Sequence, residues 1–325
     1  MPQTDELRTR SFSEYPGQIQ SLDRSFVRYL EQEVHAGKIW FKKPSDTNVV
    51  LSVIIPTSDA YRNGYFPHLL DQIENQTFRE YELFIIKGDP RQGRAINIGA
   101  AFAQGTYLLT LDDDTSLPDP DTFSKLVAAM EEDPGIGIAG GNNVIPADAT
   151  PFVRRVMQQI PRRSWEPVQE TINSDFAEHP CMIIRAETFK LVGGENELLP
   201  RGLDPYLREE FRKAGKRVVV VPGVTYHHLP PDNLKKLLRQ FYRNGRHAAY
   251  VNRHYPQWVI ETPANHGPFQ IHVSLPHRML RFPKRLLMNL FAGKPLLFIS
   301  ELAYFFGFVQ EWLLPKKLVK NPRCK

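Results

Sequence analysis

The sequence contains very little cysteine, which excludes several classes of protein. Cys181 and Cys324 are the only two cysteines among 325 residues, so neither a disulfide framework nor a CxxC metal motif can be built. The first ten residues, MPQTDELRTR, are polar and show no signal peptide. We therefore expect a protein of a reducing cytoplasm.

Internal repeats, low-complexity tracts and a strong charge imbalance are also missing. The net charge is +5, a mild excess of cations that is compatible with an anionic ligand, an anionic membrane surface or nucleic acid. Hydrophobic residues make up 42% and charged residues 24% of the chain. These shares exclude a disordered or collagen-like protein and are typical of a chain that forms a core.

Short apolar runs alternate with helical patterns through the middle of the chain. Strands are predicted at 49–57, 81–89, 106–114, 136–145 and 217–228, with a strand and a short helix in 181–194. Helices are predicted near 19–34 and at 67–76, 94–105, 121–135 and 203–215. This alternation predicts a doubly wound α/β sheet, in which ligands bind outside the carboxyl ends of the strands.

Three consecutive aspartates, Asp112, Asp113 and Asp114, close the third predicted strand. Because neighbouring side chains in a strand point to opposite faces, Asp112 and Asp114 can share a face while Asp113 points away. Clustered carboxylates suit Mg²⁺ or Mn²⁺. The alternative is a solvated acidic turn, with Asp119 and Asp121 as helix caps. The position at a strand end favours metal and nucleotide binding.

A basic and polar turn precedes the helix at 94–105. Gly93, Arg94 and Asn97 lie at or near the N-terminus of that helix, where backbone amides together with Arg91 and Arg94 could receive an anion. A surface loop followed by an amphipathic helix explains the same residues equally well.

Four stretches together resemble family 2 glycosyltransferases: LSVIIPT, RAINIGAAFAQGTYLLTLDDDTSLPDPD, LVGGENELLPRGLDPYLREEFRKAG and VTYHH. They occur in the family's order, and the resemblance covers roughly residues 49–247. It implies the GT-A fold, with a mixed sheet. It also implies an inverting enzyme that uses a divalent ion to move a sugar from a nucleotide diphosphate onto an acceptor.

The resemblance assigns roles to individual residues. Asp112 and Asp114 would hold the metal on the diphosphate, and the donor site would comprise Pro56, Thr57, Gly93, Arg94, Asn97, Asp112 and Asp113. The chain has Lys87-Gly88-Asp89 where the family commonly has an aspartate directly after the second strand. Asp89 is the expected substitute for that nucleotide contact.

Asp204 is the predicted catalytic base, because inverting transfer needs a group that accepts the proton of the acceptor hydroxyl. By the resemblance it is the second residue of a Glu-Asp motif, with Leu203 in place of the glutamate. Alternatively, Asp204 and Pro205 are simply the N-cap and first residue of a helix. Glu209 and Glu210 are substitute candidates for the base.

The pair His227-His228 follows the last predicted strand. The two side chains point in opposite directions, so at most one can complete the metal shell or contact the diphosphate. His227 is preferred, because the family often has a histidine at that place. A hydrogen-bonded structural histidine is the alternative for either residue.

The segment 232–250 is a predicted helix with one basic face. At about 100° per residue its cations form one stripe opposite an apolar one, and these cations are Lys235, Lys236, Arg239, Arg243 and Arg246. They could meet donor phosphates, a phospholipid surface or an acceptor phosphate, or form a solvated face. The stretch QFYR faintly resembles the QxxRW motif, but lacks its tryptophan, so no processivity is expected.

The segment 295–315 has the roughly 20 residues needed to span a bilayer. Glu301 lies near its centre, however, and a carboxylate there would cost roughly 2.5–3.5 kcal/mol. With the flanking cations, this composition favours an interfacial anchor on the inner face of the cell membrane. A helical pair packed on the catalytic domain or on a second subunit, and a single membrane span, are the alternatives.

The sequence thus predicts a polar extension at 1–48, a catalytic domain at 49–230 and a basic, amphipathic helical region at 231–325. Its expected partners are a nucleotide-diphosphate sugar, a lipid or envelope-glycan acceptor and a membrane surface, without nucleic acid. The alternatives are a sugar nucleotidyltransferase, a degenerate transferase that binds without turnover, and a non-catalytic adaptor that binds membranes or nucleic acid.

Overall fold

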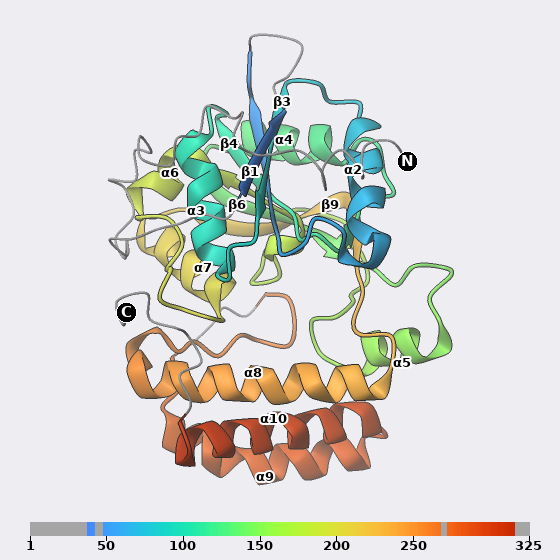
Figure 1. The fold of residues 1–325 in the computed structure, drawn as a ribbon, viewed down its shortest axis with the longest axis vertical. Coiled ribbons are helices and arrows are strands. Elements are labelled where there is room, and N and C mark those ends of the chain that lie inside the picture. The colour runs from blue at the N-terminus through green and yellow to red at the C-terminus, as the bar shows by residue number, and fades with distance from the viewer. Residues whose placement is uncertain (1–37, 43–47, 268–271, 316–325) are drawn as a thin grey trace.

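The computed structural model describes residues 38–42, 48–267 and 272–315 (Figure 1). The helix predicted near 19–34 and Cys324 lie outside these residues. The described chain has two parts, an α/β unit built on one large sheet and a set of C-terminal helices at one end of that unit (Figure 1).

The sheet is mixed, as predicted. Its strand order is β1-β3-β2-β4-β8-β6-β9-β5, and β7 pairs with β9. Two parallel groups, β3-β2-β4 and β6-β9, are joined through β8, which is antiparallel to both β4 and β6. The strands are β1 (Lys38–Lys42), β2 (Leu51–Thr57), β3 (Tyr81–Lys87), β4 (Tyr107–Thr110), β5 (Thr115–Ser116), β6 (Ile136–Asn143), β7 (Ile172–Asn173), β8 (Met182–Arg185) and β9 (Arg217–His228).

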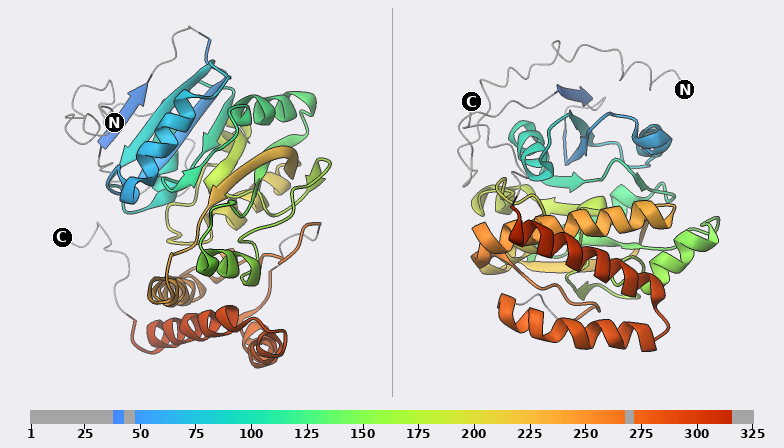
Figure 2. Two further views of the ribbon diagram at one scale, coloured as in Figure 1. Left: turned by 90° about the vertical axis from the view of Figure 1, so that its right-hand side faces the viewer. Right: turned by 60° about the horizontal axis from the view of Figure 1, so that its bottom comes forward.

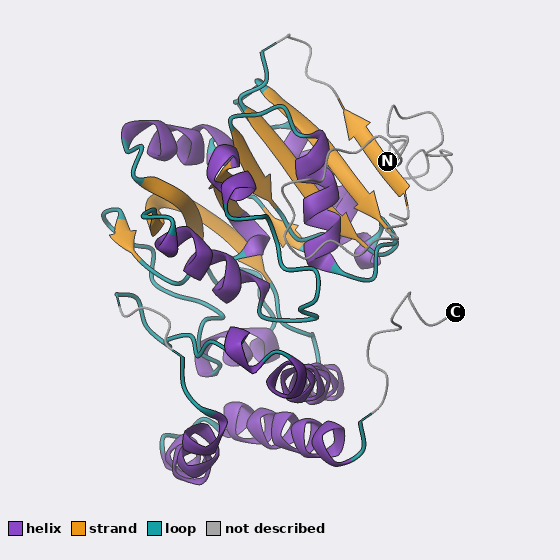
Figure 3. Cartoon of the chain, turned by 90° about the vertical axis from the view of Figure 1, so that its left-hand side faces the viewer, coloured by secondary structure: helices purple, strands orange, loops and turns teal. Residues whose placement is uncertain are grey.

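Helices cover both faces of the sheet (Figure 3), so the doubly wound arrangement is confirmed. Alternate residues of β2 point to opposite sides: Val53 and Ile55 pack in one cluster, Ile54 in the other. The first face is covered by α2 (Tyr65–Glu74) and α4 (Thr122–Glu132); the second by α3 (Gln92–Phe102), α6 (Ala186–Leu191) and α7 (Leu203–Lys213). A strand buried on both faces explains the nearly continuous apolar run LSVII.

The C-terminal part consists of α8 (Leu234–His254), α9 (Leu275–Phe291) and α10 (Pro295–Leu313), which lie as a layer against one end of the α/β unit (Figure 2). Two glycines let α8 and α10 approach closely. A Cβ on Gly245 would lie 1.9 Å from the Tyr304 carbonyl oxygen, and one on Gly307 2.0 Å from that of Tyr242. This layer is joined to the α/β unit partly through α5 (Pro151–Gln159), whose Val156 packs with residues of α8 and α10.

The polar residues of α10 face the other helices. Glu311 is buried and pairs with Arg246 of α8 at 2.8 Å, and Glu301 pairs with Arg285 of α9 at 3.0 Å. In the described part of the chain, Pro295–Leu313 is the one helix whose length and composition would allow it to cross a membrane, and 28% of its apolar window is buried. The carboxylates of Glu301 and Glu311 thus form ion pairs with arginines of the neighbouring helices.

The helical layer exposes large apolar side chains beside charged ones such as Arg281 and Lys284. Exposed side chains on α9 and α10 include Leu280, Phe291, Phe306 and Leu313. Three short 3₁₀ helices complete the described fold: η3 (Arg62–Gly64), η4 (His179–Cys181) and η5 (Pro256–Trp258).

Candidate active site

The aspartates lie in the turn that follows β4. This strand ends at Thr110, earlier than predicted, and the Thr115 amide donates to the Asp112 carbonyl at 3.0 Å. The turn leaves Asp112 and Asp114 half-buried and buries Asp113. The next residues form β5, in which Thr115 pairs with His228 of β9. This pairing brings the end of β9 beside the aspartates.

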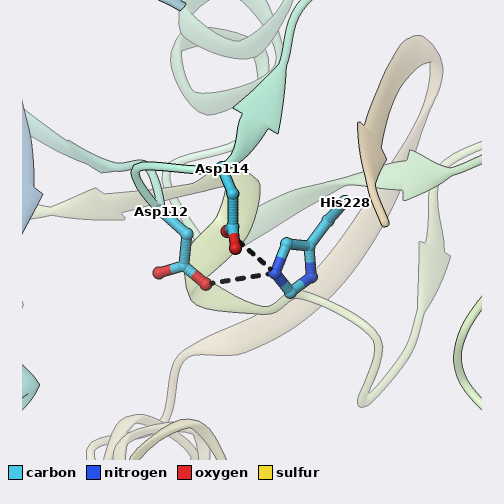
Figure 4. A group of neighbouring side chains, drawn as sticks. All are labelled: Asp112, Asp114 and His228. Carbon is cyan, nitrogen blue, oxygen red and sulfur yellow. Dashed lines mark ion pairs between the residues drawn. The ribbon is translucent and has the colours of Figure 1, made fainter. Parts of the chain in front are cut away.

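The structure places His228, rather than the expected His227, beside both carboxylates (Figure 4). His228 Nε2 lies 3.2 Å from Asp114 Oδ1 and 3.8 Å from Asp112 Oδ2. His227 points to the other side of β9, where its Nδ1 is 2.9 Å from the Val144 carbonyl oxygen. The two histidines do alternate, as expected, but the pairing of β5 with β9 selects the second one.

The three side chains influence one another's ionisation. Burial raises the pKa of Asp112 to about 6, against the opposing charge of His228. Burial has the same tendency at Asp114, but His228 and Arg62 outweigh it and hold the pKa of Asp114 well below its ordinary range. Burial tends to lower the pKa of His228, yet Asp114 and Asp112 raise it above its ordinary value. The site therefore attracts a positive charge strongly.

The carboxylates are held in place by neighbouring groups. Gln92 Nε2 donates to Asp112 Oδ1 at 2.8 Å, and Arg62 Nη2 donates to Asp114 Oδ2 at 2.6 Å. On the buried side, Thr57 Oγ1 donates to Asp113 Oδ2 at 2.6 Å. Thr57 thus supports the turn from the end of β2, next to Pro56.

The residues present fit a divalent cation. Asp112, Asp114 and His228 each offer one ligand atom, and these atoms lie within 4.8 Å of one another. Two carboxylate oxygens and one imidazole nitrogen suit Mn²⁺ or Mg²⁺, which also take water and phosphate oxygens. The hydrogen bonds to the carboxylates from Gln92 and Arg62 would orient these ligands.

The residues of α3 that were expected to line the donor site, Gly93, Arg94 and Asn97, are buried and are not among the residues that line the cavity described below. Arg94 Nε pairs with Asp89 Oδ2 at 2.8 Å, and Asp89 Oδ1 also accepts from the Arg91 amide. Asn97 Nδ2 donates to the Glu195 carbonyl at 3.0 Å. A Cβ on Gly93 would lie 3.0 Å from Leu203 Cδ2.

These contacts fasten α3 to the segment that leads into α7. Among the residues at the start of α3, Gln92 is the one that lines the cavity described below. Arg94 was predicted to bind an anion because it is positively charged. The sequence contains no signal that Arg94 forms an ion pair with Asp89.

The predicted base, Asp204, lies in the first turn of α7. This helix begins at Leu203 with Gly202 as its N-cap, so Asp204 is not the N-cap that one interpretation suggested. Its Oδ1 instead accepts from the backbone amide of His179 at 2.8 Å. Burial favours the neutral form, but the charges of His179 and Arg208 outweigh burial and lower the pKa of Asp204.

His179 is a site residue that the sequence analysis missed. Its side chain is 2% exposed and lies between two carboxylates, with Nε2 3.0 Å from Glu195 Oε1 and 3.8 Å from Asp204 Oδ1. Burial opposes the charged form, yet Asp204 and Glu195 raise the pKa of His179 to about 9. The ring is therefore an imidazolium at neutral pH, and its Nδ1 can donate to Thr110 Oγ1 at 3.1 Å.

A cavity of about 710 Å³ connects these groups. Asp112 and His228 line it beside Asp204 and His179, and it continues to the inner sides of α8, α9 and α10. The other carboxylates considered for the base, Glu209 and Glu210, are not among its lining residues, and Glu210 pairs with Lys213. Of the three candidates, Asp204 is the one that lines the cavity.

The comparisons with known proteins give a family match over part of the chain. Residues 87–193 match the model of the family described as Glycosyl transferase family 2. None of the curated proteins matches the chain.

One of the similar solved structures shares the fold at low sequence identity. The mannosyltransferase PcManGT from Pyrobaculum calidifontis, solved with GDP-Man and Mn²⁺, is 15% identical with a TM-score of 0.52, over 84% of this chain and 89% of that chain. TarS from S. aureus, solved with UDP, is 16% identical with a TM-score of 0.43, over 65% of this chain and 69% of that chain. Residues 87–193 are therefore similar to family 2 glycosyltransferases, and the chain has the GT-A fold.

Proposed function

We propose that this protein is a metal-dependent, inverting glycosyltransferase that moves a sugar from a nucleotide-diphosphate donor onto a lipid-linked or envelope-glycan acceptor. The observation that carries the proposal is the grouping of Asp112, Asp114 and His228 at the end of a parallel strand group. Asp112 and His228 of this group line the same cavity as Asp204. This is the edge of an α/β sheet at which ligands bind.

Each of the four residues has a role in the proposed transfer reaction. Asp112, Asp114 and His228 would hold Mn²⁺ or Mg²⁺, which would neutralise charge on the leaving diphosphate. The acceptor hydroxyl oxygen forms a bond to C1 of the sugar while the bond from C1 to the diphosphate oxygen breaks. Asp204 takes the hydroxyl proton, and the nucleoside diphosphate leaves.

The state of Asp204 suits a base that is ionised before the acceptor arrives. Its lowered pKa keeps the carboxylate charged at neutral pH, and the hydrogen bond from the His179 amide fixes one of its oxygens. The other oxygen is left to approach a hydroxyl. In this proposal His179 is a positioning residue, since its ring contacts the two carboxylates.

The basic and apolar C-terminal part supports a location at the inner face of the cell membrane. The exposed Leu280, Phe291, Phe306 and Leu313 of α9 and α10 lie on a layer that also carries lysines and arginines. Apolar and basic side chains together are typical of a helix that lies in the membrane interface. In this proposal 231–325 is a membrane-facing region and 49–230 the catalytic domain.

Donor binding is the direct test. GDP-mannose and Mn²⁺ come first, because a structure with the same fold was solved with both. UDP-sugars and Mg²⁺ follow. Calorimetry should show nucleotide binding that depends on the metal and is lost in Asp112→Asn and Asp114→Asn.

Product analysis with a labelled nucleotide sugar separates the alternatives. Release of nucleoside diphosphate supports transfer, whereas release of pyrophosphate indicates a nucleotidyltransferase. Nucleotide binding without product indicates a degenerate transferase. Membrane or nucleic-acid binding that survives both aspartate substitutions, without any nucleotide binding, would favour an adaptor and contradict the proposal.

A further inference from the structure

The cavity beyond Asp204 contains more positive charge than its own carboxylates balance. Arg163 and Arg201 both line it. Within the described part of the chain, no carboxylate lies within 4.0 Å ion-pair distance of either guanidinium; Arg163 Nη2 donates to the neutral Gln240 Oε1 at 3.2 Å. Of the other lining arginines, Arg162 pairs with Glu178, Arg208 with Asp175 and Arg285 with Glu301. Arg278 donates to the neutral Asn252 Oδ1.

Arg163 and Arg201 influence each other electrostatically. Burial lowers the pKa of both residues; at Arg163 the charge of Glu178 opposes this and the charge of Arg201 adds to it, and at Arg201 the charge of Asp204 opposes it. The pKa of the nearby His247 falls to about 4, first through burial and then through the charges of Arg243 and Arg201. Arg163 is half-buried and Arg201 is exposed, and two neighbouring cations without a carboxylate within ion-pair distance attract an anion.

The wall that α9 and α10 form contains apolar side chains beside the polar Arg278, Arg285, Glu301 and Tyr304. Phe282 of α9 and Phe305 of α10 stack with ring centroids 5.0 Å apart, and both line the cavity. Leu297 and Phe308 extend this surface along α10. The same two helices expose Leu280 and Phe306 on their outer sides. The same cavity is thus lined by Asp204, by the two arginines and by apolar side chains of α9 and α10.

We propose that the acceptor is a phosphate-bearing lipid, whose phosphate lies between Arg163 and Arg201 and whose hydrocarbon chain lies along Phe282 and Phe305. This inference rests on the proposed function, since it names the acceptor class of the same site. The positive charge of the two arginines is complementary to a phosphate. The apolar side chains of α9 and α10 can pack against one hydrocarbon chain. Such an acceptor would enter from the side of α9 and α10.

The test uses dodecyl phosphate as the probe, at concentrations below those at which it forms micelles, with the full-length protein. Isothermal calorimetry compares it with octyl phosphate, inorganic phosphate and dodecyl maltoside. Dodecyl phosphate should bind most tightly, because it alone offers both the anion and the long chain. Shortening the chain by four methylenes should weaken binding by about tenfold or more.

Arg201→Gln should weaken dodecyl phosphate binding by about tenfold or more, because a charge-assisted hydrogen bond is lost. Arg239→Gln, on an exposed position of α8, is the matched control and should change binding by less than about twofold. Far-ultraviolet circular dichroism checks that both variants fold. If Arg201→Gln does not fold, the headgroup and chain-length series on the wild type decides the question.

Several results would overturn the inference. Equal affinity for inorganic phosphate would indicate an anion site without a lipid, and equal affinity for dodecyl maltoside an apolar site without an anion. Equal weakening by both arginine variants would indicate surface charge only. Binding of GDP or UDP with Mn²⁺ is measured in parallel. If nucleotide binds and dodecyl phosphate does not, the acceptor inference fails alone; if nucleotide does not bind, the proposed function fails.

Discussion

Replacing His179 with glutamine should destabilise the protein most at neutral and acidic pH. On folding, burial opposes the charge of His179, but Asp204 and Glu195 raise its pKa from 6.5 to about 9. A group whose pKa is raised on folding stabilises the fold fully below its unfolded pKa, and this stabilisation is lost as the pH rises through the folded pKa. The raised pKa corresponds to about 3 kcal/mol.

Urea unfolding followed by circular dichroism measures this effect at about pH 6 and about pH 10. The variant should lose about 3 kcal/mol of unfolding free energy at the lower pH. At the higher pH it should lose only the hydrogen bond to Thr110, about 1 kcal/mol. His68→Gln changes an exposed histidine and is the matched control, expected to alter neither value by more than about 0.5 kcal/mol.

A second substitution tests the assigned cause. In a Glu195→Gln background, His179→Gln should cost less than in the wild type at about pH 6, because the buried carboxylate that needs the imidazolium is no longer charged. An equal loss at both pH values, or no coupling between His179 and Glu195, would refute the reasoning.

The remaining predictions concern the metal ligand, the base and the helix contact. His228→Gln should weaken Mn²⁺ binding by about tenfold or more in calorimetry, whereas His227→Gln should change it by less than about twofold; the reverse order would contradict the ligand assignment. Asp204→Asn should lower the transfer rate by about 10²–10⁴-fold and leave nucleotide affinity nearly unchanged, and a parallel loss of both would argue against a base. Gly307→Ala should destabilise the protein by about 1–3 kcal/mol in thermal unfolding, because the new Cβ meets the neighbouring helix backbone. Leu313→Ala, at an exposed position, is its control, and equal effects would contradict the close contact.

The fold was largely predictable because its signals are local. Buried strands such as 51–57 are short apolar runs, and helices such as 122–132 carry one apolar face, so element type and order follow from the sequence. The strand that ends at Thr110 was predicted to be longer than it is. The apolar run continues through Leu111, although the backbone has already begun to turn there.

The candidate site was only partly predictable. Asp112 and Asp114 stood out because like charges closed an apolar strand. His179 did not stand out, because a single histidine before a strand forms no recognisable pattern. Its role depends on contacts with Glu195, which lies before α7, and with Asp204, which lies in the first turn of α7. The charge of Arg94 suggested an anion site, but Asp89 neutralises it.

The sequence by itself determined the order of strands and helices and placed the aspartates at the carboxyl end of a strand, because backbone periodicity and like-charge clustering act over a few residues. Only the tertiary structure decided which histidine faces those aspartates, which arginines remain without carboxylate partners in the described chain, and that the C-terminal helices close one side of the cavity. These features depend on strand pairing and helix packing between distant segments, and a one-residue change of register would place the other side chain of each pair at the site.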